Sequence, residues 1–259
     1  AKDKICPMEN RECTPEVCPL ANGYYDRIND ALFRFLSCED AFTRENILSF
    51  AQENALCPFE LALDLSNWCD CIICDYNYLF DPIVYLRRFF DRRDRYAFLI
   101  DEAHNLVDRA RGMYSAALRK SDFLACKKLA DEVSKPLSKA LMAVNRQMLS
   151  LRKQIAQDTQ QEQEHFMTAH TLPEPLLQSL RHLFTVYSTT LEQNRRLPLQ
   201  PSLFSSAHSL VPELMQLYFD LRFFLRIADL FDERFCFFAA ASGSQLTVKL
   251  LCLDPAQMV

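Results

Sequence analysis

The chain has 259 residues, a formal net charge of -5 and a hydrophobic content of 49%, which is typical of a folded protein and excludes an intrinsically disordered one. No apolar run approaches the ~20 residues that a membrane-spanning helix needs. No basic segment followed by an apolar one stands at the start, so we expect a cytoplasmic protein in a bacterial-type cytosol or nucleoid. The negative charge indicates that any contact with nucleic acid is local.

Four cysteines of the first sixty residues are candidate metal ligands. Six and four residues separate Cys6, Cys13 and Cys18, and Cys57 follows after thirty-eight more, each except Cys13 being followed directly by proline. Eleven cysteines, an odd number without a secreted context, do not favour disulfides. Four thiolates can bind Zn²⁺ or an iron–sulfur cluster, and the spacing alone does not decide between them.

The segment between Cys18 and Cys57 has the pattern of a small helical domain. Apolar residues recur at helical spacing from Tyr24 to Phe35 and from Ile47 to Ala51. Thr43 is the expected cap of the second helix. We interpret Cys38, which follows the first helix, as a buried thiol.

A second group, Cys69, Cys71 and Cys74, is the rival for the metal ligands. Residues 71–74, Cys-Ile-Ile-Cys, favour a core strand instead, in which the two cysteines face opposite sides. A buried free cysteine is an ordinary small hydrophobic residue. We therefore expect this group to be structural.

An apolar run at residues 96–100 leads directly into the tetrapeptide Asp-Glu-Ala-His at residues 101–104. A run rich in large apolar side chains predicts a buried strand of a parallel sheet. Ligands of such sheets bind just beyond the carboxyl ends of the strands, where Asp101 and Glu102 stand.

Helices dominate the second half of the sequence. One apolar face of a long helix is marked by Leu137, Leu141, Val144, Met148, Leu151 and Ile155. Residues 157–173 are predicted as a helix end and loop, 174–196 and 210–232 as helices, and 235–241 and 246–253 as strands joined by a turn at 242–244. The predicted fold class is mostly α with a small parallel-sheet part.

These motifs together resemble those of the XPD/DinG-type iron–sulfur helicases of superfamily two. The tetrapeptide at residues 101–104 resembles their motif II, the Walker B strand with its DEAH box. Lys-Ile-Cys at residues 4–6, the two further cysteines and Cys-Pro-Phe at residues 57–59 resemble their [4Fe–4S] domain, which precedes motif II as it does here.

The resemblance implies a role for each motif residue. Asp101 would hold Mg²⁺ against the phosphates of ATP, Glu102 would act as the base that activates water, and His104 would help to couple the nucleotide to the nucleic-acid site. The ligands of one [4Fe–4S] cluster would be Cys6, Cys13, Cys18 and Cys57.

The resemblance also implies a division of the chain. Residues 1–66 would be the iron–sulfur domain, 67–113 and 242–259 part of the first motor domain, and 114–241 a helical insertion called the arch. Only three glycines occur, Gly23, Gly112 and Gly243, and none lies in a P-loop pattern. We therefore expect an internal fragment of an ATP-dependent helicase, with a role such as DNA repair, that is inactive by itself.

The expected partner is single-stranded or forked DNA, along which the intact protein moves in the 5′-to-3′ direction, most simply as a monomer. From Arg109 to Lys153 there are eleven Lys or Arg against three Asp or Glu, an excess that favours local phosphate contacts. The tyrosines near residue 77 are expected to stack on bases. The candidate DNA-binding residues are Lys2, Lys4, Tyr76, Asn77, Tyr78, Lys127, Lys128, Lys135 and Lys139.

A second hypothesis belongs to a different class. The chain would be a non-catalytic metal-cluster module that binds other proteins, and its DEAH box would be vestigial. A P-loop upstream and a second motor domain downstream in the same gene would distinguish the helicase from this module.

Overall fold

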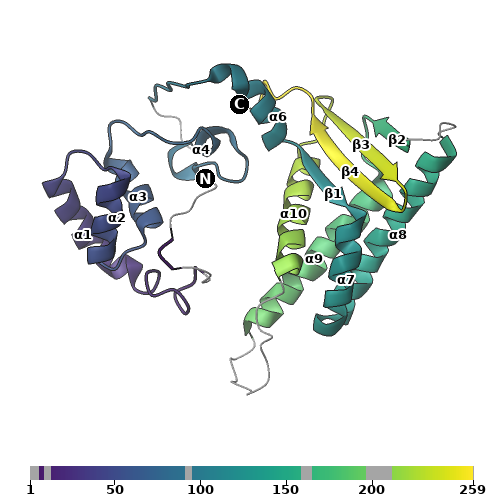
Figure 1. Ribbon diagram of the computed structural model, residues 1–259, viewed down its shortest axis with the longest axis horizontal. Coiled ribbons are helices and arrows are strands. Elements are labelled where there is room, and N and C mark those ends of the chain that lie inside the picture. Colours follow the sequence, from purple (N-terminus) through teal and green to yellow (C-terminus); the bar gives the residue numbers. More distant parts are fainter. Residues whose placement is uncertain (1–5, 9–12, 91–94, 159–164, 197–211, 259) are drawn as a thin grey trace. The chain divides into compact units, whose positions relative to one another are not determined.

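The computed structural model describes residues 6–8, 13–90, 95–158, 165–196 and 212–258. The chain divides into two compact units, Ala1–Tyr78 and Leu79–Val259 (Figure 1). No helix in the described part is long and apolar enough to cross a membrane. Helices form most of the regular structure, as predicted, and a small sheet forms the rest.

Three helices form the first unit: α1 Tyr24–Cys38, α2 Arg44–Glu53 and α3 Pro58–Leu65. Their apolar faces meet in one core, in which the rings of Phe35 and Phe50 stack with centroids 4.1 Å apart. The Thr43 hydroxyl accepts a hydrogen bond from the Asn46 amide at 3.4 Å, so both predicted helices and the predicted cap are confirmed.

Two interpretations of cysteines in this unit are wrong. Cys38 is exposed, because it lies at the last residue of α1, beyond the buried positions of that helix. Residues 71–74 form no strand, and Ile73 is 97% exposed. An apolar run forms a core strand only where other strands and covering side chains meet it, and the described residues supply neither here.

The second unit contains most of the helices and all of the strands. Along the chain, α3 is followed by η1 Ser66–Trp68, α4 Asn77–Phe80, α5 Arg87–Phe90, η2 Ala103–Asn105 and α6 Leu106–Met113. The rest comprises β1 Ala116–Arg119, α7 Lys120–Val133, α8 Lys135–Asp158, β2 His165–Ala169, α9 Glu174–Arg196, α10 Pro212–Asp229, β3 Phe235–Ser242 and β4 Gln245–Cys252. The helices predicted at 174–196 and 210–232 are confirmed as α9 and α10.

The four strands form one antiparallel sheet in the order β1-β4-β3-β2, so the predicted parallel sheet is wrong. The turn at Gly243 and Ser244 is the physical reason, because two residues join β3 directly to β4 and only antiparallel strands can be joined so tightly. Gly243 has a φ of 55°, a left-handed conformation that favours glycine. β2 is also a strand where a loop was predicted.

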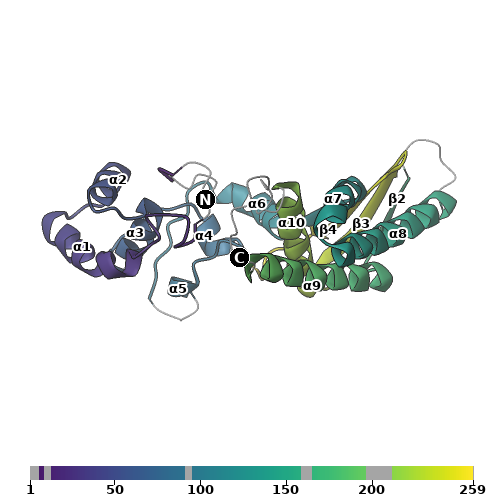
Figure 2. The same cartoon turned by 90° about the horizontal axis from the view of Figure 1, so that it is seen from below.

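The sheet has one buried face and one open face. Side chains alternate along each strand, with Leu118 of β1, Phe237 of β3 and Val248 of β4 fully buried beneath helices α7, α8 and α10 (Figures 1 and 2). The six predicted apolar residues of α8 lie in the same core, which confirms the predicted helix face. This core includes β4, so residues 246–252 pack with the helices of 114–241.

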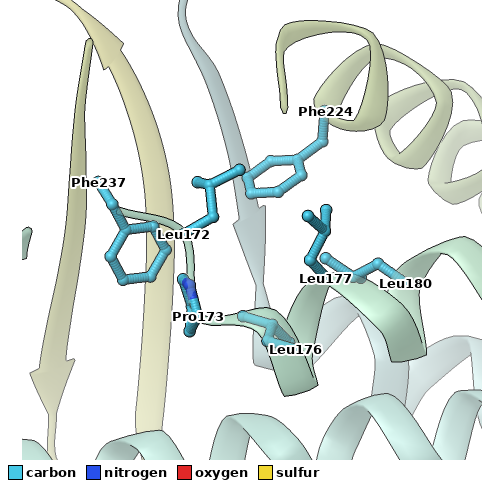
Figure 3. Close-up of a pocket in the computed structure, with 7 residues that line it drawn as sticks. All are labelled: Leu172, Pro173, Leu176, Leu177, Leu180, Phe224 and Phe237. Carbon is cyan, nitrogen blue, oxygen red and sulfur yellow. The ribbon is translucent and has the colours of Figure 1, made fainter. Parts of the chain in front are cut away.

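One small apolar cavity interrupts this core (Figure 3). Its volume is about 10 Å³, and it lies where α9, α10 and β3 meet. It is lined by Leu172, Pro173, Leu176, Leu177, Leu180, Phe224 and Phe237. A space of this size and apolarity holds at most about one water molecule, so it is a packing defect rather than a ligand site.

Candidate functional site

Asp101 and Glu102 form an exposed turn that we call the acid turn. Glu102 has a φ of 51°, a left-handed conformation that is uncommon for a residue with a side chain. The Glu102 amide donates to Oδ1 of Asp101 at 2.8 Å, and the Asn105 amide donates to the Glu102 carbonyl at 2.9 Å. The extended chain thereby turns sharply into η2 and α6.

His104 lies on the same turn as the two acids. Its Nε2 is 3.3 Å from Oε2 of Glu102, and both side chains are well exposed, at 72% and 65%. The structure therefore brings all three predicted motif residues together. An imidazole beside a carboxylate can hold that carboxylate in one orientation or receive a proton from it.

The run that precedes the acid turn is not a buried strand, contrary to the prediction. Residues 95–100 form no strand or helix, and Leu99 is fully exposed. Phe98, Tyr96 and Phe90 pack together instead, with ring centroids 5.6 to 6.0 Å apart. A parallel strand is stable only between neighbouring strands and under helices, and the sheet of this chain is built from other residues.

Cys57 is a half-buried candidate metal ligand. It occupies the N-cap position of α3, next to the backbone amides of Phe59 and Glu60, and makes no side-chain capping hydrogen bond. Burial raises the pKa of the Cys57 thiol, these amides lower it in part, and the nearby charges of Glu60 and Cys6 raise it again.

The remaining two candidate ligands lie in the same unit. Cys18 is buried and begins the turn into α1, whereas Cys13 and Cys6 are exposed. All four thiols are free. Within the described ranges, no three Cys, His, Asp or Glu side chains are arranged to hold a metal ion, so the four cysteines are not gathered into a preformed site.

The rival cysteines do not form a site either. The Cys69 thiol contacts the Leu65 carbonyl at 3.4 Å, and burial, then the charges of Asp70 and Cys71, raise its pKa. Cys71 and Cys74 are exposed. In the described residues, these three cysteines therefore form neither a buried strand nor a metal site.

The predicted DNA-binding tyrosines lie in and before the short helix α4. The Asn77 amide donates to Oδ1 of Asp75 at 3.0 Å, so an aspartate fixes the start of this turn. Tyr76 and Tyr78 are half-buried, and burial, then Cys74 and Asp75, raise the pKa of Tyr78. Each ring thus presents part of one edge or face to solvent.

The excess of basic residues between Arg109 and Lys153 is only partly free to bind phosphate. Lys127 pairs with Asp131 at 2.6 Å one turn along α7, and this pair lowers the pKa of Asp131. Lys120, one of these basic residues, is only 7% exposed and donates a hydrogen bond to the Ser244 carbonyl at 2.7 Å, so it is not available to phosphate. Of the lysines predicted to bind DNA, Lys128, Lys135 and Lys139 are exposed, while Lys2 and Lys4 lie outside the described residues.

The DEAD_2 family model matches residues 1–123, which include the acid turn and all four candidate cysteine ligands. Residues 1–123 are a DEAD_2 region. The match ends at Phe123, inside α7, so α8 to α10 and strands β2 to β4 lie outside the DEAD_2 region.

Three relatives are similar to parts of the chain. A stretch covering 48% of it is 28% identical to the regulator of telomere elongation helicase 1 homolog of Caenorhabditis elegans and spans 13% of that protein. A stretch covering 41% is 29% identical to the helicase subunit XPD/RAD3 of general transcription and DNA repair factor IIH from Saccharomyces cerevisiae, over 13% of its length. A stretch covering 35% is 31% identical to the Fanconi anemia group J protein homolog of Gallus gallus, over 7%.

The matches therefore span 7% to 13% of these relatives. Two of the three bear the name helicase. The DEAD_2 region is thus homologous to a part of XPD-type superfamily-two helicases, and the resemblance on which the site residues were assigned is confirmed at the level of the family.

Proposed function

We propose that this chain is part of an ATP-dependent, iron–sulfur DNA helicase and that the acid turn belongs to its ATP hydrolysis site. The observation that carries the proposal is the pair of exposed, adjacent carboxylates on a left-handed turn inside a DEAD_2 region. Neighbouring acids of this kind serve in nucleoside triphosphatases to hold Mg²⁺ and to position the attacking water.

The two carboxylates of the acid turn have different surroundings, which suits two roles. Asp101 is oriented by the Glu102 amide, and a carboxylate held by its own backbone suits a hydrated cation. Mg²⁺, when bound with ATP, would neutralise charge that develops on the phosphates. Glu102 projects beyond the turn toward His104, and it would accept a proton from water while His104 fixes its orientation.

We further propose that Cys6, Cys13, Cys18 and Cys57 bind one [4Fe–4S] cluster. The donor chemistry fits, because all four are free thiols of one compact unit and Cys57 stands at the N-terminus of α3. The four thiols do not lie together in this structure, and metal binding is commonly coupled to the folding of the residues that form the site. The four thiolates would hold the cluster, whose binding would bring Cys6, Cys13 and Cys18 together with Cys57 at the start of α3.

We propose the division of labour that the family pattern implies. Residues 1–66 would be the cluster domain, 67–113 with 242–259 a part of the motor domain, and 114–241 the arch beside the path of single-stranded DNA. The P-loop would come from residues outside these 259, because none of the three glycines lies in such a pattern.

The test compares two acids that lie six residues apart in the intact protein. Glu102→Gln should keep ATP binding and lower kcat for hydrolysis by about a hundredfold or more, as expected for loss of a general base. Asp108→Asn is the matched control, since Asp108 is an exposed acid of α6 paired with Arg111 at 3.2 Å. Near-normal turnover of Glu102→Gln would refute the assignment of the base.

A further inference from the structure

The sheet of the second unit has a solvent-exposed outer face whose composition is unusual. Side chains of this face come from all four strands and alternate with the buried ones. The four strands contain no Asp or Glu. We define the outer face as Ala117, Arg119, Phe166, Thr168, Phe238, Ala240, Thr247 and Lys249.

Two aromatic rings lie together at the β2 and β3 side of the outer face. Phe166 and Phe238 stack with centroids 5.9 Å apart and an angle of 23° between their planes. Phe166 is 58% exposed. Strand register places Phe166 opposite Ala240, so a small side chain leaves the approach to its ring open.

Two basic side chains complete the outer face on the β4 and β1 side. The Lys249 ammonium lies 5.8 Å from the centre of the Phe238 ring, a cation–π contact that holds it over the strands. Strand register places Arg119 opposite Thr247, and both Arg119 and Lys249 are exposed. Aromatic rings and positive charges thus share one face.

We propose that the outer face binds single-stranded nucleic acid, with bases stacked on Phe166 and Phe238 and phosphates beside Lys249 and Arg119. Every base has an apolar face that can stack on an aromatic ring, and the backbone carries one negative charge per nucleotide. The proposal rests on the proposed function and gives the arch a defined contact surface.

The charge pattern favours nucleic acid over a protein partner for this face. Cross-strand stacking alone explains why two phenylalanines pack together, but it does not require an exposed Phe166 and a half-buried Phe238 beside two cations. The four strands carry no acid that could neutralise Arg119 and Lys249, so the partner must supply the negative charge. A polymer with one charge per unit supplies it more regularly than a protein surface of mixed charge. A phosphate backbone complements both.

The experiment measures binding of fluorescein-labelled oligothymidylate to the full 259-residue chain by fluorescence anisotropy at several salt concentrations. Phe166→Ala and Phe238→Ala should each weaken binding by about tenfold. Phe166→Leu retains apolar packing on the strand and should lose nearly as much, because it lacks the ring face. Lys249→Gln should weaken binding and reduce the slope of log Kd against log salt by about one.

Phe219→Ala and Arg222→Gln are the matched controls, because both residues are exposed on α10 and away from the sheet. Each should bind within twofold of the unaltered chain. Equal binding by the Phe166, Phe238 and Lys249 variants, or no binding by the unaltered chain, would overturn the proposal and leave the ATPase test of Glu102 untouched. A dimer that Phe166→Ala dissociates in sedimentation would also overturn it, in favour of a contact between copies.

Discussion

Glu102 carries the clearest sign of function at the level of single residues. Its left-handed backbone costs about 1–2 kcal/mol for a residue with a Cβ atom, and glycine would avoid that cost. Backbone strain at a non-glycine residue persists where its surroundings require it, often at sites of chemistry. The strain and the pairing with His104 thus point to the same residue that the proposed mechanism uses as base.

The Cys57 thiol gives a prediction on reactivity that depends on pH. Because burial raises its pKa, Cys57 has less thiolate at neutral pH than an ordinary cysteine. In the metal-free chain at about pH 7.5, iodoacetamide should modify Cys57 at least about threefold more slowly than the exposed Cys38, and the difference should shrink as pH rises toward 9. Mass spectrometry of timed samples measures both rates. Faster modification of Cys57 would show that burial does not govern its ionisation.

At the level of elements, the β3–β4 turn and α6 each contain one glycine, and the two differ in backbone conformation. A Cβ atom at Gly243 or Gly112 would meet no atom within 4 Å, so space does not distinguish them. Gly243 has a positive φ, whereas Gly112 lies within a helix. Gly243→Ala should therefore lower the free energy of unfolding by about 1 kcal/mol, and Gly112→Ala should raise it by about 0.5 kcal/mol.

Denaturant unfolding of both variants measures these changes, and each variant serves as the other's control. Equal effects of the two substitutions would show that the turn conformation does not specify the hairpin. The same result would also count against the proposed binding surface on the outer face, because that surface depends on the β3–β4 register.

Elements set by local pattern were predictable from the sequence. The apolar spacing of Leu137, Leu141 and Val144 defines α8, because a helix needs only its own hydrogen bonds and one buried face. The Thr43 cap was found for the same reason. The strand β2, His165–Ala169, was missed, because a short strand is stabilised by its neighbour β3 rather than by its own sequence.

At the level of the whole molecule, the burial of apolar runs could not be predicted from the local sequence pattern. Leu99 and Ile73 are apolar and belong to runs that resemble core strands, yet both are exposed, because burial depends on strands distant in sequence. For the candidate site, the acid turn followed from its tetrapeptide. The outer face did not, since Phe166, Phe238 and Lys249 come together only through strand pairing.

The proposed cluster domain, residues 1–66, offers the most direct test of the proposal that this chain is part of an iron–sulfur helicase. The 259-residue chain, purified without oxygen, should be brown and contain about four irons and four acid-labile sulfides. Cys57→Ser should lose most of this iron, whereas Cys38→Ser, at an exposed cysteine of the same unit, should keep it. A colourless chain with stoichiometric zinc, or full iron content in Cys57→Ser, would contradict the account.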